Sequence, residues 1–156
     1  MKNNRILFII SITLLITSFG CGTLVGGRKY VGSIIVVNHS HASISVDGKQ
    51  IGVGTAIESF PRKKPLSVLV KQEGCEAETK VFNNSFRTGS LIFSASLFGY
   101  AGIAVDLYTG ASFKPDHKRD SAIQKISRKN YVFLIDYKSC PSDSEIEKLN
   151  LQEGGE

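Results

Sequence analysis

Apolar and polar residues alternate along several short stretches of this chain, which predicts β-strands. Between residues 42 and 46, alanine, isoleucine and valine alternate with serines, the period of two that is typical of a half-buried strand. The Asp47-Gly48 pair that follows predicts a two-residue hairpin turn, because glycine accepts the positive φ that a type I′ turn requires. We therefore expect residues 49–53 to return as the partner strand.

Four further apolar stretches extend this set of strands. Residues 34–37 are a β-branched run, and residues 66–70 place apolar side chains at alternate positions before a glycine turn. Residues 76–82 alternate in a similar way, and residues 131–135 are apolar on both faces, which predicts a buried closing strand. Short strands joined by tight turns indicate a mainly β fold, and we expect a small antiparallel β-sandwich.

A glycine-rich apolar segment interrupts the strands and carries no charge between Arg87 and Asp106. Its uncharged part approaches the about 20 residues of a membrane-spanning helix, but serines, glycines and a threonine dilute it. The favoured interpretation is an inserted helix or helical hairpin packed on the β domain. A hairpin dipping into a membrane comes second, and a full span, with Asp106 capping its far end, comes third.

Three small residues inside this segment have helical spacing. They recur at i, i+4 and i+7, which places them on one face of a continuous helix. Small side chains on one face would let another backbone approach closely. These residues are Ala95, Gly99 and Gly102.

The first residues have the three-part pattern of a secretory signal. Lys2 and Arg5 form a basic start, residues 6–16 are an apolar run, and small residues lead to Cys21. The apolar run is shorter than the about 20 residues that a span needs, which argues against an N-terminal transmembrane anchor.

The sequence SFGC at residues 18–21 resembles a lipobox, the processing site of bacterial lipoproteins. That resemblance implies cleavage between Gly20 and Cys21 and lipid on the Cys21 thiol. It also implies three lipid chains, which hold a protein far more firmly than one. Gly22, where some lipoproteins carry Asp, favours the outer membrane, with the protein facing the periplasm.

Charge is distributed unevenly along the chain. The formal net charge is +5, and it is +3 without Lys2 and Arg5. The tail after Cys140 holds five acids and one lysine, so the body from Cys21 to Cys140 carries +7. A basic body on a short anchor would lie near anionic headgroups, each nearby cation contributing about 1 kcal/mol. Nucleic acid is not an expected partner, because basic and aromatic residues do not interleave.

The pattern AxIxVDGKxIGxGT over residues 42–55, together with a later glycine turn, resembles the PEGA domain of bacterial envelope proteins. This resemblance covers about a third of the chain and implies a small β-sandwich in an envelope setting, without catalytic residues. The stretch ending in VDLYTGA at residue 111 also resembles a glycine-rich segment of small bacterial lipoproteins. The residues that match the PEGA pattern are Ala42, Val46, Asp47, Gly48, Gly52, Gly54, Thr55 and Gly74.

Cysteine and histidine spacings limit the chemistry. Cys75 and Cys140 could pair in an oxidising compartment, where closing so long a loop would contribute about 4 kcal/mol, but the sequence leaves the pairing open. No Cys/His spacing suited to zinc is found, and we expect neither a metal nor a cofactor. His39 and His41 lie two apart at a strand edge, and we interpret them as solvated turn residues.

We find no catalytic constellation and expect that the protein is not an enzyme. Asp116 and Asp120 could in principle act as an acid-base pair. We interpret them instead as part of a solvent-facing loop, because His117, Lys118 and Arg119 lie between them. The glycine-rich stretches lack the spacing of a phosphate-binding loop, and no nucleophile elbow occurs.

The expected function is that of a lipid-anchored envelope protein with a non-catalytic binding or structural role. The alternative is a protein-interaction module, such as an assembly accessory or an immunity-type lipoprotein. The predicted organisation is a signal peptide (1–20), a tether (21–31), a PEGA-like β domain (32–83), an apolar glycine-rich segment (84–113), a basic loop with the closing strand (114–140) and an acidic tail (141–156). We expect the tail to be a short frayed helix or disordered. The candidate surface for anionic lipid or envelope glycan comprises Arg62, Lys63, Lys64, Lys118, Arg119, Arg128 and Lys129.

Overall fold

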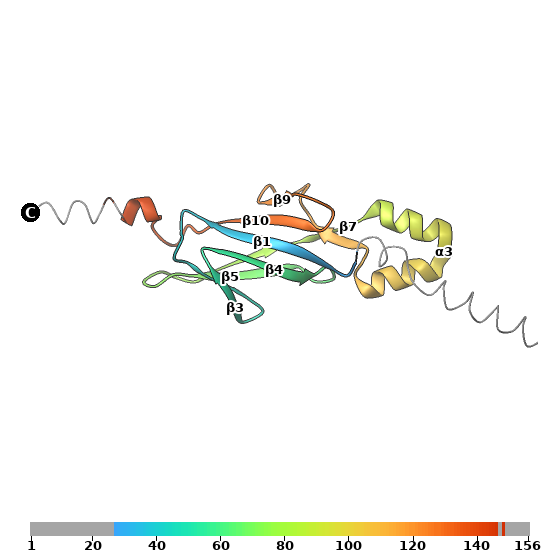
Figure 1. Cartoon of the computed structure of the whole chain (residues 1–156), viewed down its shortest axis with the longest axis horizontal. Helices are drawn as coiled ribbons and strands as arrows, with labels where there is room; N and C mark the ends of the chain where they lie inside the picture. Colours follow the sequence, from blue (N-terminus) through green and yellow to red (C-terminus); the bar gives the residue numbers. More distant parts are fainter. Residues whose placement is uncertain (1–26, 147, 149–156) are drawn as a thin grey trace, which may run out of the picture. The chain divides into compact units, whose positions relative to one another are not determined.

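A computed structural model describes residues 27–146 and residue 148 of the chain (Figure 1). These residues form two compact units, between which the chain passes several times. The hairpin unit comprises described residues 27–29, 61–64 and 84–114. The β unit comprises described residues 30–60, 65–83, 115–146 and 148.

The β unit is built on one sheet of eight strands in the order β6-β5-β2-β3-β4-β1-β10-β9. Between β3 and β4 the register is a single residue pair, Val53 with Thr55. The rings of Phe82 on β6 and Phe133 on β10 lie 5.0 Å apart, although these strands are far apart in the sheet order. The sheet therefore folds over on itself into a sandwich-like arrangement, and the expected mainly β fold is confirmed. The strands are β1 (Lys29–Val37), β2 (Ser43–Val46), β3 (Lys49–Val53), β4 (Thr55–Pro61), β5 (Leu66–Lys71), β6 (Glu78–Phe82), β9 (Ile123–Lys125) and β10 (Asn130–Asp136).

Alternate residues of the longer strands fill the space inside this folded sheet. On β5 the residues at 66, 68 and 70 are buried, and on β10 the residues at 131, 133 and 135 are buried. Each buried aliphatic or aromatic side chain of this size contributes about 1.5–3 kcal/mol relative to an exposed one. The period of two in the sequence therefore identified the inward-facing positions correctly.

The turn between β2 and β3 is the expected two-residue hairpin. Asp47 and Gly48 both have positive φ, at 50° and 78°, and Val46 pairs with Lys49 across the turn. Positive φ at both central residues is the signature of a type I′ turn.

One strand pair runs in a direction that the sequence pattern did not predict. β10 lies parallel to β1, with Ile34 opposite Phe133. The pairs β9–β10, β2–β3, β2–β5, β3–β4 and β5–β6 are antiparallel. Parallel neighbours need a long connection between them, and the chain between β1 and β10 includes most of both units. Period-two patterning places residues on faces but does not set the direction of a strand.

The hairpin unit contains α3 (Thr88–Thr109) between two short paired strands, β7 (Asn84–Phe86) and β8 (Phe113–Pro115). Gly99, at φ 59° and ψ −147°, breaks α3 into two helical arms (Figure 1). The expected helical hairpin is therefore confirmed, but Ala95, Gly99 and Gly102 do not share one continuous helical face. Among the described residues, no helix is both long and apolar enough to cross a membrane.

Candidate functional site

The two arms of α3 are joined through a buried polar pair. The Ser94 hydroxyl donates a hydrogen bond of 2.5 Å to Oδ2 of Asp106, and both residues are fully buried. Asp106 also accepts the backbone N–H of Ser112 on its carbonyl, at 3.3 Å. The least favoured of the three sequence interpretations placed Asp106 at the end of a span. In the structure its carboxylate is buried and joins the two arms through Ser94.

The outer surface of the hairpin is rich in large apolar side chains. Five of them are between 39% and 92% exposed, and Tyr100, immediately after the Gly99 bend, is the most exposed. Exposed apolar residues scattered singly are normal on a soluble protein, but a group on one short element marks an interaction surface. These five residues, the apolar hairpin surface, are Ile92, Phe93, Tyr100, Leu107 and Tyr108.

Basic residues of the loop 61–64 lie against this hairpin. The Nζ of Lys63 is 5.2 Å from the centre of the exposed Tyr108 ring, which is a cation–π distance. Gly110 caps the second arm with φ 79°, and a Cβ placed there would come within 2.7 Å of Cβ of Lys63. The loop and the end of the helix therefore fit closely, and both Lys63, beside the Tyr108 ring, and Lys64 remain exposed.

Arg62 does not belong to the candidate contact surface, which corrects the expectation from sequence. Its side chain is fully buried, and its guanidinium approaches the carbonyl of Phe113 on β8 at 3.5 Å. Its own carbonyl accepts a 2.9 Å hydrogen bond from the Asn84 side chain on β7. Arg62 therefore connects its loop to both short strands of the hairpin unit and is not available to a ligand.

The other basic candidates are exposed, but they fall on two units. Lys63 and Lys64 belong to the hairpin unit, whereas Lys118, Arg119, Arg128 and Lys129 belong to the β unit. The Arg119 guanidinium is largely exposed and lies 3.9 Å from the Asp116 carboxylate. The seven predicted residues therefore belong to two different units, and one of them, Arg62, is buried.

Net charge separates sharply between the units. The described part of the β unit has ten basic and ten acidic residues, so its formal charge is zero. The described part of the hairpin unit has seven basic residues and one acid, the buried Asp106, so its formal charge is +6. The basic residues of the hairpin unit are Arg28, Lys29, Arg62, Lys63, Lys64, Arg87 and Lys114.

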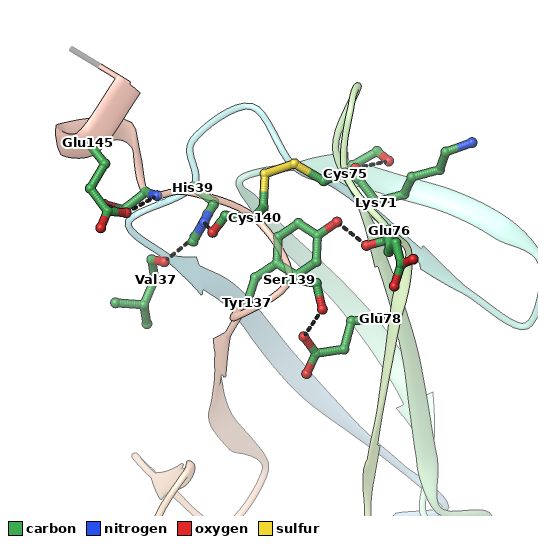
Figure 2. Close-up of a disulfide and its surroundings, with 12 residues drawn as sticks. Val37, His39, Lys71, Cys75, Glu76, Glu78, Tyr137, Ser139, Cys140 and Glu145 are labelled. Atoms are coloured by element: carbon green, nitrogen blue, oxygen red, sulfur yellow. Dashed lines mark hydrogen bonds between the residues drawn. A yellow bond between two sulfur atoms is a disulfide. The ribbon is translucent and has the colours of Figure 1, made fainter. Parts of the chain in front are cut away.

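A second polar cluster lies around a disulfide in the β unit (Figure 2). Cys75 and Cys140 are bonded, with their Cα atoms 5.4 Å apart, and they close a loop of 65 residues. The Tyr137 hydroxyl donates a hydrogen bond to the carbonyl of Glu76, next to this disulfide. The pairing that the sequence left open is thus made in the structure.

His39 lies inside this cluster, although we had expected a solvated turn residue. It is 4% exposed and its ring packs 5.2 Å from that of Tyr137. Its Nδ1 is 2.7 Å from the Val37 carbonyl, and its Nε2 is 3.1 Å from the Cys140 carbonyl. A neutral imidazole can donate to one of these carbonyls, and the doubly protonated ring can donate to both. His41, in contrast, is exposed, as expected.

The segment after the disulfide is held to the β1–β2 turn. Asp143 Oδ2 accepts the Ser40 N–H at 2.7 Å, and the Asp143 N–H donates to the Asn38 carbonyl at 2.9 Å. The hydrogen bond from Ser40 lowers the pKa of Asp143 below its ordinary value. The adjacent shallow depression, about 370 Å³ in volume, is lined by Val36, Asn38, His39, Ser40, Val53, Gly54, Thr55 and Asp143.

The start of the acidic tail is ordered by a capping box. The Ser142 N–H and hydroxyl both donate to Glu145 Oε2, at 2.7 and 2.8 Å, and residues 143–146 form a helical turn. The backbone hydrogen bond from Ser142 is the main cause of the lowered pKa of Glu145. This part of the tail therefore matches the expectation of a short helix, and its last residues lie outside the described part of the chain.

Asp116 and Asp120 have structural partners in the loop before β9. Asp116 is buried, against our expectation, and its carbonyl accepts the N–H groups of Arg119 and Asp120. Asp120 Oδ1 accepts the Ala122 N–H at 3.0 Å. Both residues therefore serve to shape the turn. Within the described ranges, no group of three or more His, Cys, Asp or Glu side chains is arranged to hold a metal ion.

Several of these roles could not be identified from sequence. Asp106 is the single acid in a long uncharged segment, and that isolation was the available signal. Burial of Arg62, His39 and Asp116 depends on neighbours distant in the chain and has no local signature. The predicted cleavage and lipidation residues, Gly20 and Cys21, lie outside the described residues.

Comparisons with protein-family models, with curated proteins and with solved structures find no match to this chain.

Proposed function

We propose that this chain is a lipid-anchored protein of the bacterial cell envelope with a non-catalytic binding or structural role. The observation that carries the proposal is the order of features in its first residues. A basic start and an apolar run at 6–16 lead to Gly20 and Cys21, the arrangement of a lipoprotein signal. In this proposal Cys21 is the first residue of the mature protein, and it carries the lipid that holds the chain in the outer membrane.

The disulfide supports export from the cytoplasm. Disulfides persist in oxidising compartments such as the periplasm and are rare where thiols are kept reduced. Cys75 and Cys140 are bonded, and Cys140 is 8% exposed, within the hydrophobic core of the β unit. A structural disulfide of this kind agrees with the envelope setting that the signal indicates.

A non-catalytic role is supported by what the polar side chains do. Ser94 and Asp106 fasten the hairpin, and Asp143 holds the segment after the disulfide. The Asp120 carboxylate accepts the Ala122 N–H, and the Asp116 carboxylate lies 3.9 Å from the Arg119 guanidinium. Acid-base catalysis needs a carboxylate or imidazole directed at a reacting group, whereas these groups are directed at partners within the chain.

The test compares the wild-type protein with Cys21→Ala exported by an unrelated cleavable signal. We expect wild-type protein in the membrane fraction, with a mature N-terminus at Cys21 and the added mass of lipid. The Cys21→Ala protein should lack that mass. A wild-type mature protein that starts elsewhere, carries no lipid and is recovered as soluble protein would contradict the proposal. Density-gradient separation of the two membranes then tests the outer-membrane assignment.

A further inference from the structure

The hairpin unit combines two properties that proteins use to lie on membranes. It exposes the apolar hairpin surface, in which two of the five residues are tyrosines. Its described residues carry a formal charge of +6, whereas those of the β unit are neutral. Tyrosine rings favour the boundary between headgroups and acyl chains, and clustered Lys and Arg residues are attracted to anionic lipids.

The length of chain between the predicted lipid and the hairpin unit limits how far apart they can be. The backbone N–H of Arg62 donates to the Arg28 carbonyl at 2.9 Å, so residue 28 is fixed to the loop beside the hairpin. Arg28 is seven positions after Cys21, and a fully extended chain over seven positions spans about 25 Å at most. An anchor at Cys21 therefore keeps the hairpin unit within reach of the bilayer surface.

The size of the hairpin suits shallow insertion. Gly99 divides α3 into two arms of about ten residues each, and at about 1.5 Å per residue an arm is about 15 Å long. That is about half of the roughly 30 Å hydrocarbon core of a bilayer. The Gly99 bend returns the chain to the side from which it came, and the internal Ser94–Asp106 bond satisfies polar groups between the arms.

We infer that the α3 hairpin is a second membrane contact, which inserts its Tyr100 end into the headgroup region of an anionic phospholipid bilayer. Lys63 and Lys64 would meet lipid phosphates while Tyr108, next to Lys63, lies at the interface. This inference rests on the proposed lipid anchor for its geometry, but the apolar and basic surfaces belong to the described residues.

The absence of tryptophan from the chain makes the test direct. Tyr100→Trp gives the protein a sole indole at the end of the hairpin, where the native side chain is 92% exposed. Ile57→Trp is the matched control, because Ile57 is 69% exposed on β4 of the β unit. Each full-length variant is matured in cells, purified and reconstituted into vesicles of phosphatidylethanolamine and phosphatidylglycerol.

We expect the indole at position 100 to emit at shorter wavelength in vesicles than in buffer and to lose emission when brominated lipids replace normal ones. The indole at position 57 should show neither change. Tyr108→Trp provides a second probe in the hairpin unit and should respond in the same direction, so the result does not depend on a single substitution.

Other outcomes separate this inference from the proposed function. If the protein carries lipid on Cys21 but the indole at position 100 stays fully water-exposed in vesicles, the hairpin inference is wrong and the anchor stands. If Cys21 carries no lipid, the anchor fails, and adding the same variants to preformed vesicles still decides the hairpin by quenching or its absence. Shielding of position 100 in cells but not in vesicles would show that a protein covers the hairpin, which also overturns the inference.

Discussion

At the scale of single residues, the charged and polar side chains that are buried hold distant segments together. His39 bridges two carbonyls around the disulfide, and Ser94 bridges the arms of α3 through Asp106. A buried polar group that loses its partner retains the cost of its removal from water. Substitutions at these buried residues should therefore lower the free energy of unfolding more than substitutions at exposed polar residues.

His39→Ala should lower the free energy of unfolding by about 2–3 kcal/mol, because it removes the donor to a carbonyl of this cluster and opens space beside Tyr137. His41→Ala is the matched control, since His41 is exposed two residues away, and it should change the stability by less than about 0.5 kcal/mol. Urea unfolding of both variants at neutral pH measures the difference. Equal effects would show that His39 is not buried as described.

The Asp143–Ser40 contact should make the β unit sensitive to acid. Hydrogen bonds from Ser40 lower the pKa of Asp143 from its ordinary value of 3.8, so the folded state favours the charged carboxylate. The stabilisation is therefore present above pH 3.8 and is lost as the pH falls through the lowered pKa. Asp143→Asn should flatten this part of the stability profile, as measured by urea midpoints between pH 7 and pH 2. An unchanged acid limb would contradict the role given to Asp143.

Sequence reasoning at this scale succeeded where a residue is defined by its immediate neighbours. The Asp47-Gly48 turn was predictable, because both residues tolerate positive φ and the flanking strands alternate. The burial of Arg62 was not predictable, because it depends on β7 and β8, which are formed by residues far along the chain. Without knowledge of β7 and β8, the basic segment 61–64 is expected to be exposed to solvent.

At the scale of elements, the bend in α3 is the feature on which the hairpin depends. Gly99 has φ 59° and ψ −147°, a backbone conformation that is close to exclusive to glycine. The residues on both sides of Gly99 are helical, so the break in α3 lies at this one residue.

Gly99→Ala should destabilise the hairpin by about 1–3 kcal/mol, because a Cβ strains this backbone conformation. Gly89→Ala is the control, since Gly89 has ordinary helical geometry and open space at its Cβ position, and it should be neutral or stabilise by up to about 1 kcal/mol. Hydrogen exchange of the amides in α3 measures local opening in both variants. Faster exchange in Gly89→Ala than in Gly99→Ala would exclude this account of the bend.

The elements themselves were mostly visible in the sequence. Strands that are buried on one face carry a period of two, and the uncharged segment with small residues indicated a helix or hairpin. The parallel direction of β10 beside β1 was not visible, because apolar positions on both faces fit either direction. The sequence also did not show that the bend lies at Gly99, because each of the other glycines of α3 could have formed it.

At the scale of the whole molecule, net positive charge is concentrated on one of the two units. The hairpin unit holds the formal charge of +6, and the β unit is neutral over its described residues. Total charge from the sequence did not reveal this division, because the hairpin unit is assembled from three separated segments.

The double substitution Lys63→Gln and Lys64→Gln should weaken binding of the Cys21→Ala protein to phosphatidylglycerol vesicles by about 30-fold. Each nearby cation contributes about 1 kcal/mol, or about fivefold in affinity. Lys118→Gln with Arg119→Gln removes the same charge from the β unit and should change binding by less than about twofold. Co-sedimentation at low and high salt measures all three proteins. Equal losses in both double variants would assign binding to net charge and not to the hairpin unit.

The Cys75–Cys140 disulfide encloses the whole of α3 in its loop, since residues 88–109 lie between the two cysteines in sequence. A protease that cuts the chain at the exposed Gly99–Tyr100 bend would therefore not divide the molecule. The fragment after the cut would stay covalently joined to the fragment that contains Cys21. Cleavage at this bend would therefore not shed the C-terminal part of the protein, and a reductant would be required to release it.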